Sequence, residues 1–431
     1  MAYAQVTRSA LATEILEALG TGASTYWATS EVNRTINEAL LYWGALTSYW
    51  RERGTFNTVA NTAFYDLNTQ FPTLRPRTIT MGEIAREIQY HLLEPANGVA
   101  GTGMTVQFTV GQITSAIERA RNQFVIDALL PLTDGSFNVL PATDGRTTLN
   151  DSIVGIQRVA WLDGSGIYTP LRREDGAAAD ATNYLWPMTP KTPFAYSIAE
   201  TRPVELQFLP PPVDAGTMRL LYVKSVNLVT AEATSLELPN EFASGVKYGA
   251  LHELLSTNNE GYDPMRSQYA LERYRQVVDA ARSYQSAIRV QLERKPLAFD
   301  TIWNMDAARP TWMNKTGTPN FAGLAYDFLG LSHVPSGVFG MTCDVVRAAP
   351  LPTADADFIQ MGREEIPYLV NYCRHVLSFK LGGSDFESTF KLYDNFIKGA
   401  MQRNINLVAR SRYLKALFGK AQKQIEQEVP A

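Results

Sequence analysis

The sequence predicts an α+β protein: a helical bundle of long helical hairpins with inserted, mostly antiparallel β domains, partly duplicated. Apolar residues recur every three or four positions in several segments, which is the period of an amphipathic helix. Between residues 137 and 229, short apolar runs alternate with Gly, Pro, Asp and Asn, which favours strands. Two later stretches read as diverged copies of one unit. A hydrophobic content of 45% and a charged content of 19% fit a folded chain of this class.

The first third of the chain predicts four helices and one hairpin. A short helix over 6–19 ends at a glycine, and an amphipathic helix over 31–50 follows it. The passage 56–67 alternates like a β-hairpin, with its turn near its centre. Further helices are expected over 81–93 and 110–130, and a proline ends each of them.

The middle of the chain predicts an antiparallel β domain. Strand candidates cover 153–162, 194–198, 204–209 and 218–226. The triple proline that begins at Pro210 separates two of them and forces an extended turn. No helical pattern lies between these strands, so parallel crossover units are not expected.

Two helical hairpins are expected after this β region. The first covers 241–255 and 264–292, and the second covers 364–381 and 386 to about 426. Asp263 before Pro264 is a strong helix start, because Asp caps the helix and Pro fits its first position. Residues 296–350 return to a strand-like and turn-rich texture.

The repeated unit is visible as matching motifs in the two hairpin regions. Thr230-Ala-Glu-Ala precedes Phe242-x-x-x-Val246-x-Tyr248, and Thr353-Ala-Asp-Ala precedes Ile366-x-x-x-Val370-x-Tyr372. We therefore expect three domains, over 1–104, 105–295 and 296–431. Duplicated packing residues without duplicated reactive residues favour a scaffold over an enzyme.

Bulk charge and cysteine content exclude several classes. A net charge of −4 gives the whole molecule no general attraction for nucleic acid. No apolar run is long enough for a transmembrane helix, and the first residues do not read as a secretion signal. Cys343 and Cys373 are too few for a disulfide framework or a four-thiolate metal site, and they fit a reducing interior.

The search for catalytic groups gives only weak candidates. His252-Glu253 resembles the start of a zinc-protease helix, but Ser256 stands where the second histidine is needed. Cys373 and His375 are two positions apart, which places them on different helix faces. The acids Asp355, Asp357, Glu364 and Glu365 suit a helix N-terminus. We expect no catalytic residue, metal or cofactor; the enzyme alternative, such as a hydrolase, requires reactive groups that line one pocket.

A basic C-terminal stretch is the candidate docking site. No acid lies between Asn395 and Ile425, whereas Lys and Arg are frequent there. Apolar residues among the charges suit docking to an acidic protein partner. The alternatives are a solvated helix face and a DNA-phosphate contact. The candidate residues are Arg410, Arg412, Leu414, Lys415, Leu417, Phe418, Lys420 and Lys423.

These motifs resemble the bacteriophage head-to-tail adaptor proteins. The similar residues are the run from Leu236 to Phe242, the helix through Val246 and the Asp263-Pro264 turn. The passage Thr55-Phe-Asn-Thr-Val-Ala and its continuation Phe64-Tyr-Asp-Leu resemble the opening of the family. The resemblance covers about 30–71 and 110–292. It weakens after residue 300, where Met361-Gly362 and Gly382-Gly383-Ser384-Asp385 replace the Leu-Pro and Asp-Pro signatures.

Membership of this family implies a structural virion protein, made in the host cytoplasm and located at the head-tail junction. It implies a ring, commonly of twelve copies, below the portal, with tail or nozzle proteins as further partners. Double-stranded DNA passes through such a ring without sequence-specific binding, and no membrane is involved. The alternative is a tail-tube, nozzle or baseplate ring protein of the phage tail.

Overall fold

The fold is described from a computed structural model that covers most of the chain. The described residues are 5–20, 26–72, 78–93, 107–139, 145–164, 166–175, 189–199, 204–225, 231–257, 261–284, 287–293 and 295–404. The described residues form both helices and β-sheets, so the mixed α+β class is confirmed.

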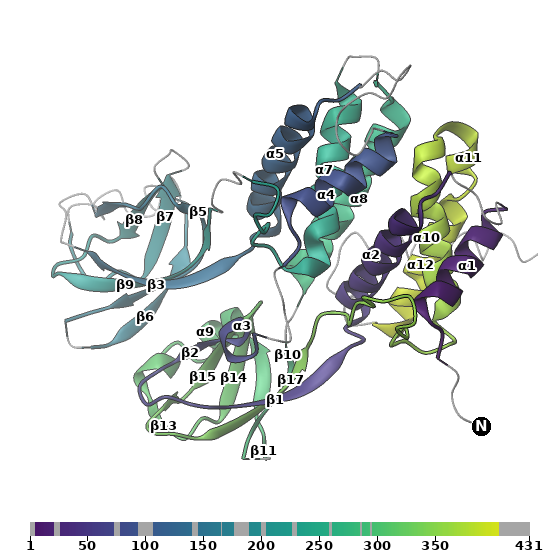
Figure 1. The fold of residues 1–431 in the computed structure, drawn as a ribbon. Coiled ribbons are helices and arrows are strands. Elements are labelled where there is room, and N and C mark those ends of the chain that lie inside the picture. The colour runs from purple at the N-terminus through teal and green to yellow at the C-terminus, as the bar shows by residue number, and fades with distance from the viewer. Residues whose placement is uncertain are drawn as a thin grey trace, which may run out of the picture.

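The helices fall into two groups that lie side by side (Figure 1). One group contains α4 (Met81–Leu92), α5 (Val110–Ala128), η2 (Asn240–Phe242), α7 (Ala243–Ser256) and α8 (Pro264–Ser283). The other contains α1 (Arg8–Ala18), α2 (Thr29–Thr47), α10 (Ile366–Ser378), η4 (Phe379–Leu381), α11 (Gly383–Glu387) and α12 (Phe390–Arg403).

The strands also form two bodies, each adjoining one helical group (Figure 1). The first has the order β3-β9-β5-β6-β7-β8-β4. Its strands are β3 (Leu132–Val139), β4 (Arg146–Thr148), β5 (Ile153–Leu162), β6 (Tyr168–Arg173), β7 (Ala195–Ala199), β8 (Glu205–Leu209) and β9 (Gly216–Lys224).

The second body is built from smaller sheets, with the orders β1-β17-β10-β11, β12-β14-β15-β2 and β13-β16. Its strands are β1 (Arg51–Asn57), β2 (Phe64–Asp66), β10 (Ala287–Leu292), β11 (Lys295–Pro296), β12 (Ala298–Thr301), β13 (Thr316–Gly317), β14 (Phe321–Ala325), β15 (Phe328–Ser332), β16 (Val334–Pro335) and β17 (Gly340–Val346). The short helices α3 (Leu67–Gln70), α9 (Ile302–Ala308) and η3 (Trp312–Asn314) lie among them.

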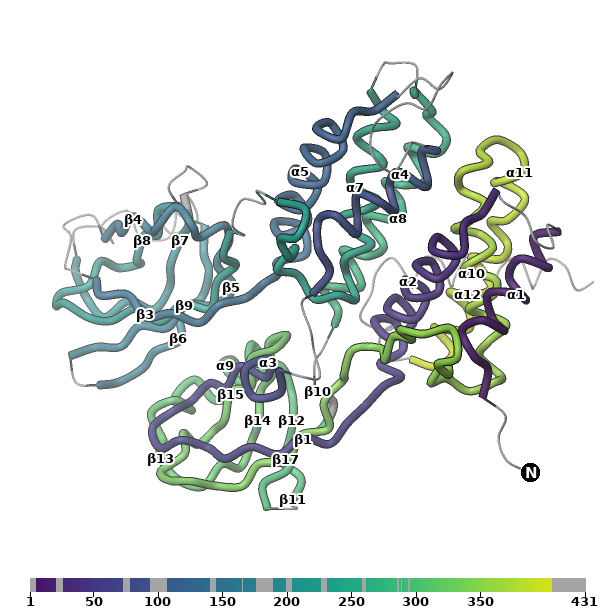
Figure 2. The backbone as a smooth tube through the Cα atoms, viewed as in Figure 1, coloured from purple at the N-terminus to yellow at the C-terminus, as the bar shows by residue number. Residues whose placement is uncertain are grey.

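The two ends of the described chain belong to the same half of the molecule. β1 pairs with β17, and β2 pairs with β15, so the hairpin predicted over 56–67 is wrong: its two strands belong to different sheets. We call residues 5–72 and 287–404 the enclosing unit, and residues 78–284 the inserted unit. Figure 2 shows the backbone leaving the enclosing unit after β2 and α3 and returning to it at β10. The predicted domains 1–104, 105–295 and 296–431 stay a prediction, because chain contacts do not measure independent folding.

Local signals explain where the helices begin and end. The Thr80 side chain accepts from the Glu83 backbone at the start of α4, and Glu83 returns the contact to Thr80. Asp263 caps α8, and Pro264 occupies its first turn, as predicted. Ser48 ends α2 in the left-handed conformation, which turns the chain directly into β1.

The long helical hairpins are the main correction to the predicted fold. α8 ends at Ser283, and 287–292 forms strand β10 where a continued helix was expected. Val290 is fully buried in β10 and pairs with Cys343 of β17, so burial in a sheet overrides the local helical spacing. α12 ends at Arg403, and the rest of the second predicted hairpin lies outside the described residues.

Close packing between α5 and α7 yields a first testable prediction. A Cβ atom on Gly245 would lie 2.5 Å from the Phe124 ring. We expect Gly245→Ala to lower the free energy of unfolding by about 1–3 kcal/mol, because the core must be overpacked. Urea unfolding measures the loss. Gly111→Ala, a helical position with open space around it, serves as the matched control and should not destabilise. Equal stability of the two variants would contradict this packing.

Candidate functional site between the two helical units

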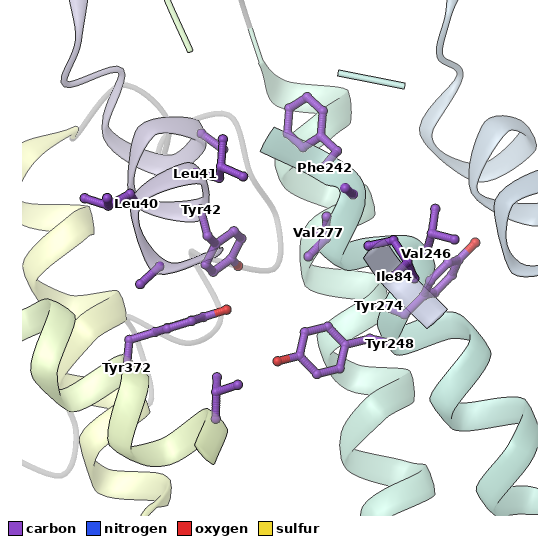
Figure 3. Close-up of a cluster of buried hydrophobic side chains, with 14 of the residues drawn as sticks. Leu40, Leu41, Tyr42, Ile84, Phe242, Val246, Tyr248, Tyr274, Val277 and Tyr372 are labelled. Carbon is purple, nitrogen blue, oxygen red and sulfur yellow. The ribbon is translucent and has the colours of Figure 1, made fainter. Parts of the chain in front are cut away.

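The largest hydrophobic cluster runs through both helical groups and joins them. Leu41, Tyr42 and Tyr372 of the enclosing unit face Phe242 and Tyr248 of the inserted unit (Figure 3). These side chains come from α2, η2, α7 and α10. The hydroxyls of Tyr248 and Tyr372 point toward one another across it (Figure 3).

A buried ion cluster crosses this contact. Lys247 of α7 is fully buried and forms ion pairs with Glu38 of α2 and with Glu87 of α4. The Tyr372 hydroxyl donates to the second oxygen of Glu38 at 2.9 Å. Burial raises the pKa of the Glu87 carboxyl to about 7; Lys247 opposes this shift and Glu38 adds to it. One ammonium therefore holds two carboxylates that come from different units.

A second buried cation, Arg273 of α8, lies in a cage of tyrosines. Its guanidinium donates to the Tyr372 hydroxyl at 2.8 Å and to the Tyr393 hydroxyl. The Tyr42 and Tyr248 rings lie within cation–π distance, at 4.9 and 5.0 Å. Since Tyr42, Tyr372 and Tyr393 belong to the enclosing unit, Arg273 fixes the inserted unit against it.

A partly polar cavity lies beside the ion cluster. It has a volume of about 330 Å³ and is lined by residues of both units, among them Arg34, Glu83 and Glu87. In the described part of the chain, no group of three or more His, Cys, Asp or Glu side chains has a metal-binding arrangement.

Cys373 and His375, expected to be a poor nucleophile–base pair, are both fully buried on α10. Burial raises the pKa of the Cys373 thiol well above its usual value. His375 lies 2.6 Å from the Tyr269 hydroxyl and 2.8 Å from the Thr389 hydroxyl. Burial, with a smaller contribution from Arg273, lowers the pKa of His375 to about 3.

His375 gives a second prediction, for the pH dependence of stability. Its pKa is lower in the folded state, so the unfolded chain binds more protons between pH 3 and 6.5. Stability contributed by neutral His375 is therefore present above pH 6.5 and lost as pH falls. We expect His375→Asn to flatten the slope of unfolding free energy between pH 4 and 6 by about 1.4 kcal/mol per pH unit. Urea unfolding across this range measures the slope; Ser378→Ala, which removes a non-titrating hydroxyl from the same helix, should leave it unchanged. Equal slopes for His375→Asn and wild type would contradict the assignment.

The other weak candidates also have structural roles. His252 lies 2.9 Å from the Ser267 hydroxyl, which joins α7 to α8. Asp355 forms an ion pair with Arg8. Asp357 accepts two backbone N–H groups of the preceding turn, and these bonds lower its pKa. Asp357 thus stabilises a turn that precedes α10. The sequence had instead favoured an interaction of this carboxylate with the helix dipole.

The predicted docking residues cannot be placed. Arg410, Arg412, Leu414, Lys415, Leu417, Phe418, Lys420 and Lys423 all lie outside the described residues.

The buried cations Lys247 and Arg273 were missed by the sequence analysis. A usable signal existed for one of them: Lys247 stands between Val246 and Tyr248 in an apolar stretch of helix, where a charge requires a partner.

Comparison with known proteins matches one family to the chain. The model for the SU10 adaptor protein matches residues 79–298, slightly more than half of the sequence. The chain belongs to the SU10 adaptor protein family. The matched region covers the inserted unit and continues into β10 and β11, so most of the enclosing unit lies outside it. The search of curated proteins gave no match.

Membership of the SU10 adaptor family makes the chain a phage adaptor-type structural protein, as the resemblance implied at this coarser level. Interaction with other phage structural proteins and a place in the virion follow from the same match. Within the described residues, none of the helices of this adaptor is both long and apolar enough to span a bilayer.

Proposed function

We propose that the protein is a head-to-tail adaptor that forms a ring, joins the portal to the tail and lines part of the DNA channel. Its partners are other copies of itself (twelve in the ring expected from the resemblance), the portal protein, and tail or nozzle proteins. Double-stranded DNA passes through without sequence-specific binding. The protein acts at the head-tail junction of the virion, and it works without catalysis.

The family match over the inserted unit is the observation that carries this proposal. The chemistry of the unit contact supports it. The polar side chains at this contact are buried and bind one another, so their interactions stabilise the packing of the two units. They are Lys247, Glu38, Arg273 and Tyr372. Cys373 is held as a neutral thiol, which is a poor nucleophile. These features suit a rigid part of an assembly.

The decisive experiment is binding to isolated portal rings, followed by mass measurement and electron microscopy. We expect a complex with one ring of this protein on each portal ring. Binding to tail proteins with no binding to portals would favour the tail-tube, nozzle or baseplate alternative. A substrate converted by the purified chain would overturn the non-catalytic assignment.

The basic C-terminal stretch gives a further prediction. Removal of residues 411–431 should weaken portal binding while thermal unfolding stays the same, because the stretch removes several cations that would attract an acidic partner. Binding that is unchanged would show that the stretch is a solvated end. Strong, salt-sensitive DNA binding lost on truncation would favour nucleic-acid contact.

A further inference from the structure

The two units repeat each other in backbone register. Arg51 of β1 pairs with Val346 of β17, and Leu132 of β3 pairs with Val223 of β9. The next strand has the same irregularity in both: a bulge between Ala287 and Arg289 of β10, and one between Ile156 and Arg158 of β5. The sheet order β1-β17-β10-β11 therefore corresponds to β3-β9-β5-β6, with a fixed residue offset within each pair of equivalent strands.

The helices correspond in the same way. α2 and α5 each have 19 residues and end in a left-handed residue, Ser48 or Leu129, just before β1 or β3. α1 and α4 both follow a capping threonine, Thr7 or Thr80. Backbone bonds to the later segment recur too: Arg8 to Asp357, Ser9 to Asp355 and Ile359 to Val6 in one unit, and Met81 to Thr234, Gly82 to Glu232 and Leu236 to Ile79 in the other.

The two units meet through different faces. α4 of the inserted unit lies against α2 and η4 of the enclosing unit. Tyr90 is 2.9 Å from the Ser30 hydroxyl, and Arg34 reaches the Glu83 carbonyl at 3.5 Å. The equivalent of α4 in the enclosing unit is α1, which takes no part in these bonds. The contact is therefore head-to-tail, and each unit keeps one face unused by it.

The unused face of the inserted unit carries a groove at the matching position. The groove between α5 and α7 has a volume of about 520 Å³ and is lined by Gly111, Ser115, Arg119, Glu253, Leu254 and Thr257. Gly111, Ser115 and Arg119 are the positional equivalents of Ser30, Arg34 and Glu38 on α2. The α5–α7 groove thus corresponds to the seat that α4 occupies on the enclosing unit.

The unused face of the enclosing unit has the complementary charge. Glu14 and Glu17 of α1, the equivalents of Glu87 and Tyr90 on α4, are exposed. In the α5–α7 groove, Arg119 is 61% exposed although it pairs with Glu253. Arg158 of β5 binds Asp306 between the two β bodies. Arg289 occupies the equivalent position on β10 of the enclosing unit, and it is exposed.

We propose that a second copy of this chain docks its α1 helix into the α5–α7 groove, repeating between chains the contact that α4 makes within one chain. Each chain then fills two consecutive positions of the assembly, so a ring contains twice as many units as chains. This inference rests on the proposed function, because it assumes that copies of the chain assemble with one another.

Charge reversal on each side tests the docking with full-length chains. Arg119→Glu alters only the groove, and Glu14→Lys with Glu17→Lys alters only α1. Each variant alone should self-associate about tenfold more weakly than wild type, as measured by sedimentation and native mass. An equimolar mixture of the two should regain assembly, because the unchanged α1 of one variant meets the unchanged groove of the other, and the reversed α1 meets the reversed groove with opposite charges. Arg172→Glu, at an exposed arginine of β6, is the control and should assemble normally.

The outcomes separate this inference from the proposed function. Thermal unfolding close to wild type shows that the exposed substitutions leave the fold intact. Normal assembly of both variants, or a mixture that assembles no better than either variant alone, overturns the α1 docking even where portal binding persists. A wild-type chain that stays monomeric at high concentration also overturns it. A wild-type chain that self-associates, with the expected losses in the two variants, but ignores portal and tail proteins keeps this inference and removes the proposed function.

Discussion

Replacing Lys247 with methionine should lower the free energy of unfolding by about 3–5 kcal/mol. The substitution leaves Glu38 and Glu87 close together in the interior without the cation that both contact. Denaturant unfolding at pH 7.5 measures the loss. The loss should shrink toward pH 5, because Glu87, whose pKa is already raised to about 7, then takes up a proton.

Two further variants test the physical reason for this loss. Adding Glu38→Gln to Lys247→Met should recover a substantial part of the stability, since it removes one of the uncompensated charges. Arg119→Met breaks an exposed ion pair with Glu253 and should cost no more than about 1 kcal/mol. If Lys247→Met costs as little as Arg119→Met, the buried cluster does not hold the two units together.

Trp43→Ala should also lower the free energy of unfolding by about 3–5 kcal/mol. Trp43 is fully buried on α2 and lies against Tyr368 of α10 and Phe396 of α12, with ring centroids 5.7 and 5.4 Å away. The cavity left by the indole would weaken the packing of α2 against α10 and α12. Hydrogen exchange should therefore quicken in α10 and α12 before it does in α5 and α7.

The repeat supplies a matched set of controls for Trp43. Phe124 occupies the corresponding position on α5 and is also fully buried, so Phe124→Ala should shift the exchange effect to α5 and α7. Trp43→Phe should cost less than half as much as Trp43→Ala. Trp303→Ala, at a tryptophan that is 39% exposed, should cost about 1 kcal/mol or less. Uniform loss of protection in both units after Trp43→Ala would contradict a local effect.

Much of the local structure could be predicted from the sequence. The expected helices over 81–93 and 110–130 are α4 and α5, and the strand expected over 153–162 is β5. The period of apolar residues and the capping residues encode such elements within a few turns of chain. The helix expected over 264–292 was predicted too long. Its last residues form β10, which pairs with β17 about fifty residues later in the chain, and no local pattern indicates that pairing.

The candidate site was less predictable, for the same reason. Glu38 and Lys247 lie far apart in the sequence, and although Lys247 stands in an apolar stretch of helix, no local pattern identifies Glu38 as its partner. The basic residues favoured for docking stood out because they fall within one short stretch that has no acid, and they remain a prediction. A sequence shows runs of charge readily, whereas a buried ion pair becomes visible only when its two helices meet.

By itself, the sequence determined the type and order of most elements, the repeated motifs and the resemblance to phage adaptors, because these depend on residues close together in the chain. Only the tertiary structure decided that one unit is inserted into the other, that β1 closes onto β17, and that buried charges bridge the two helical groups. Those features depend on pairing between distant segments, and the loss of water around both partners sets their energy.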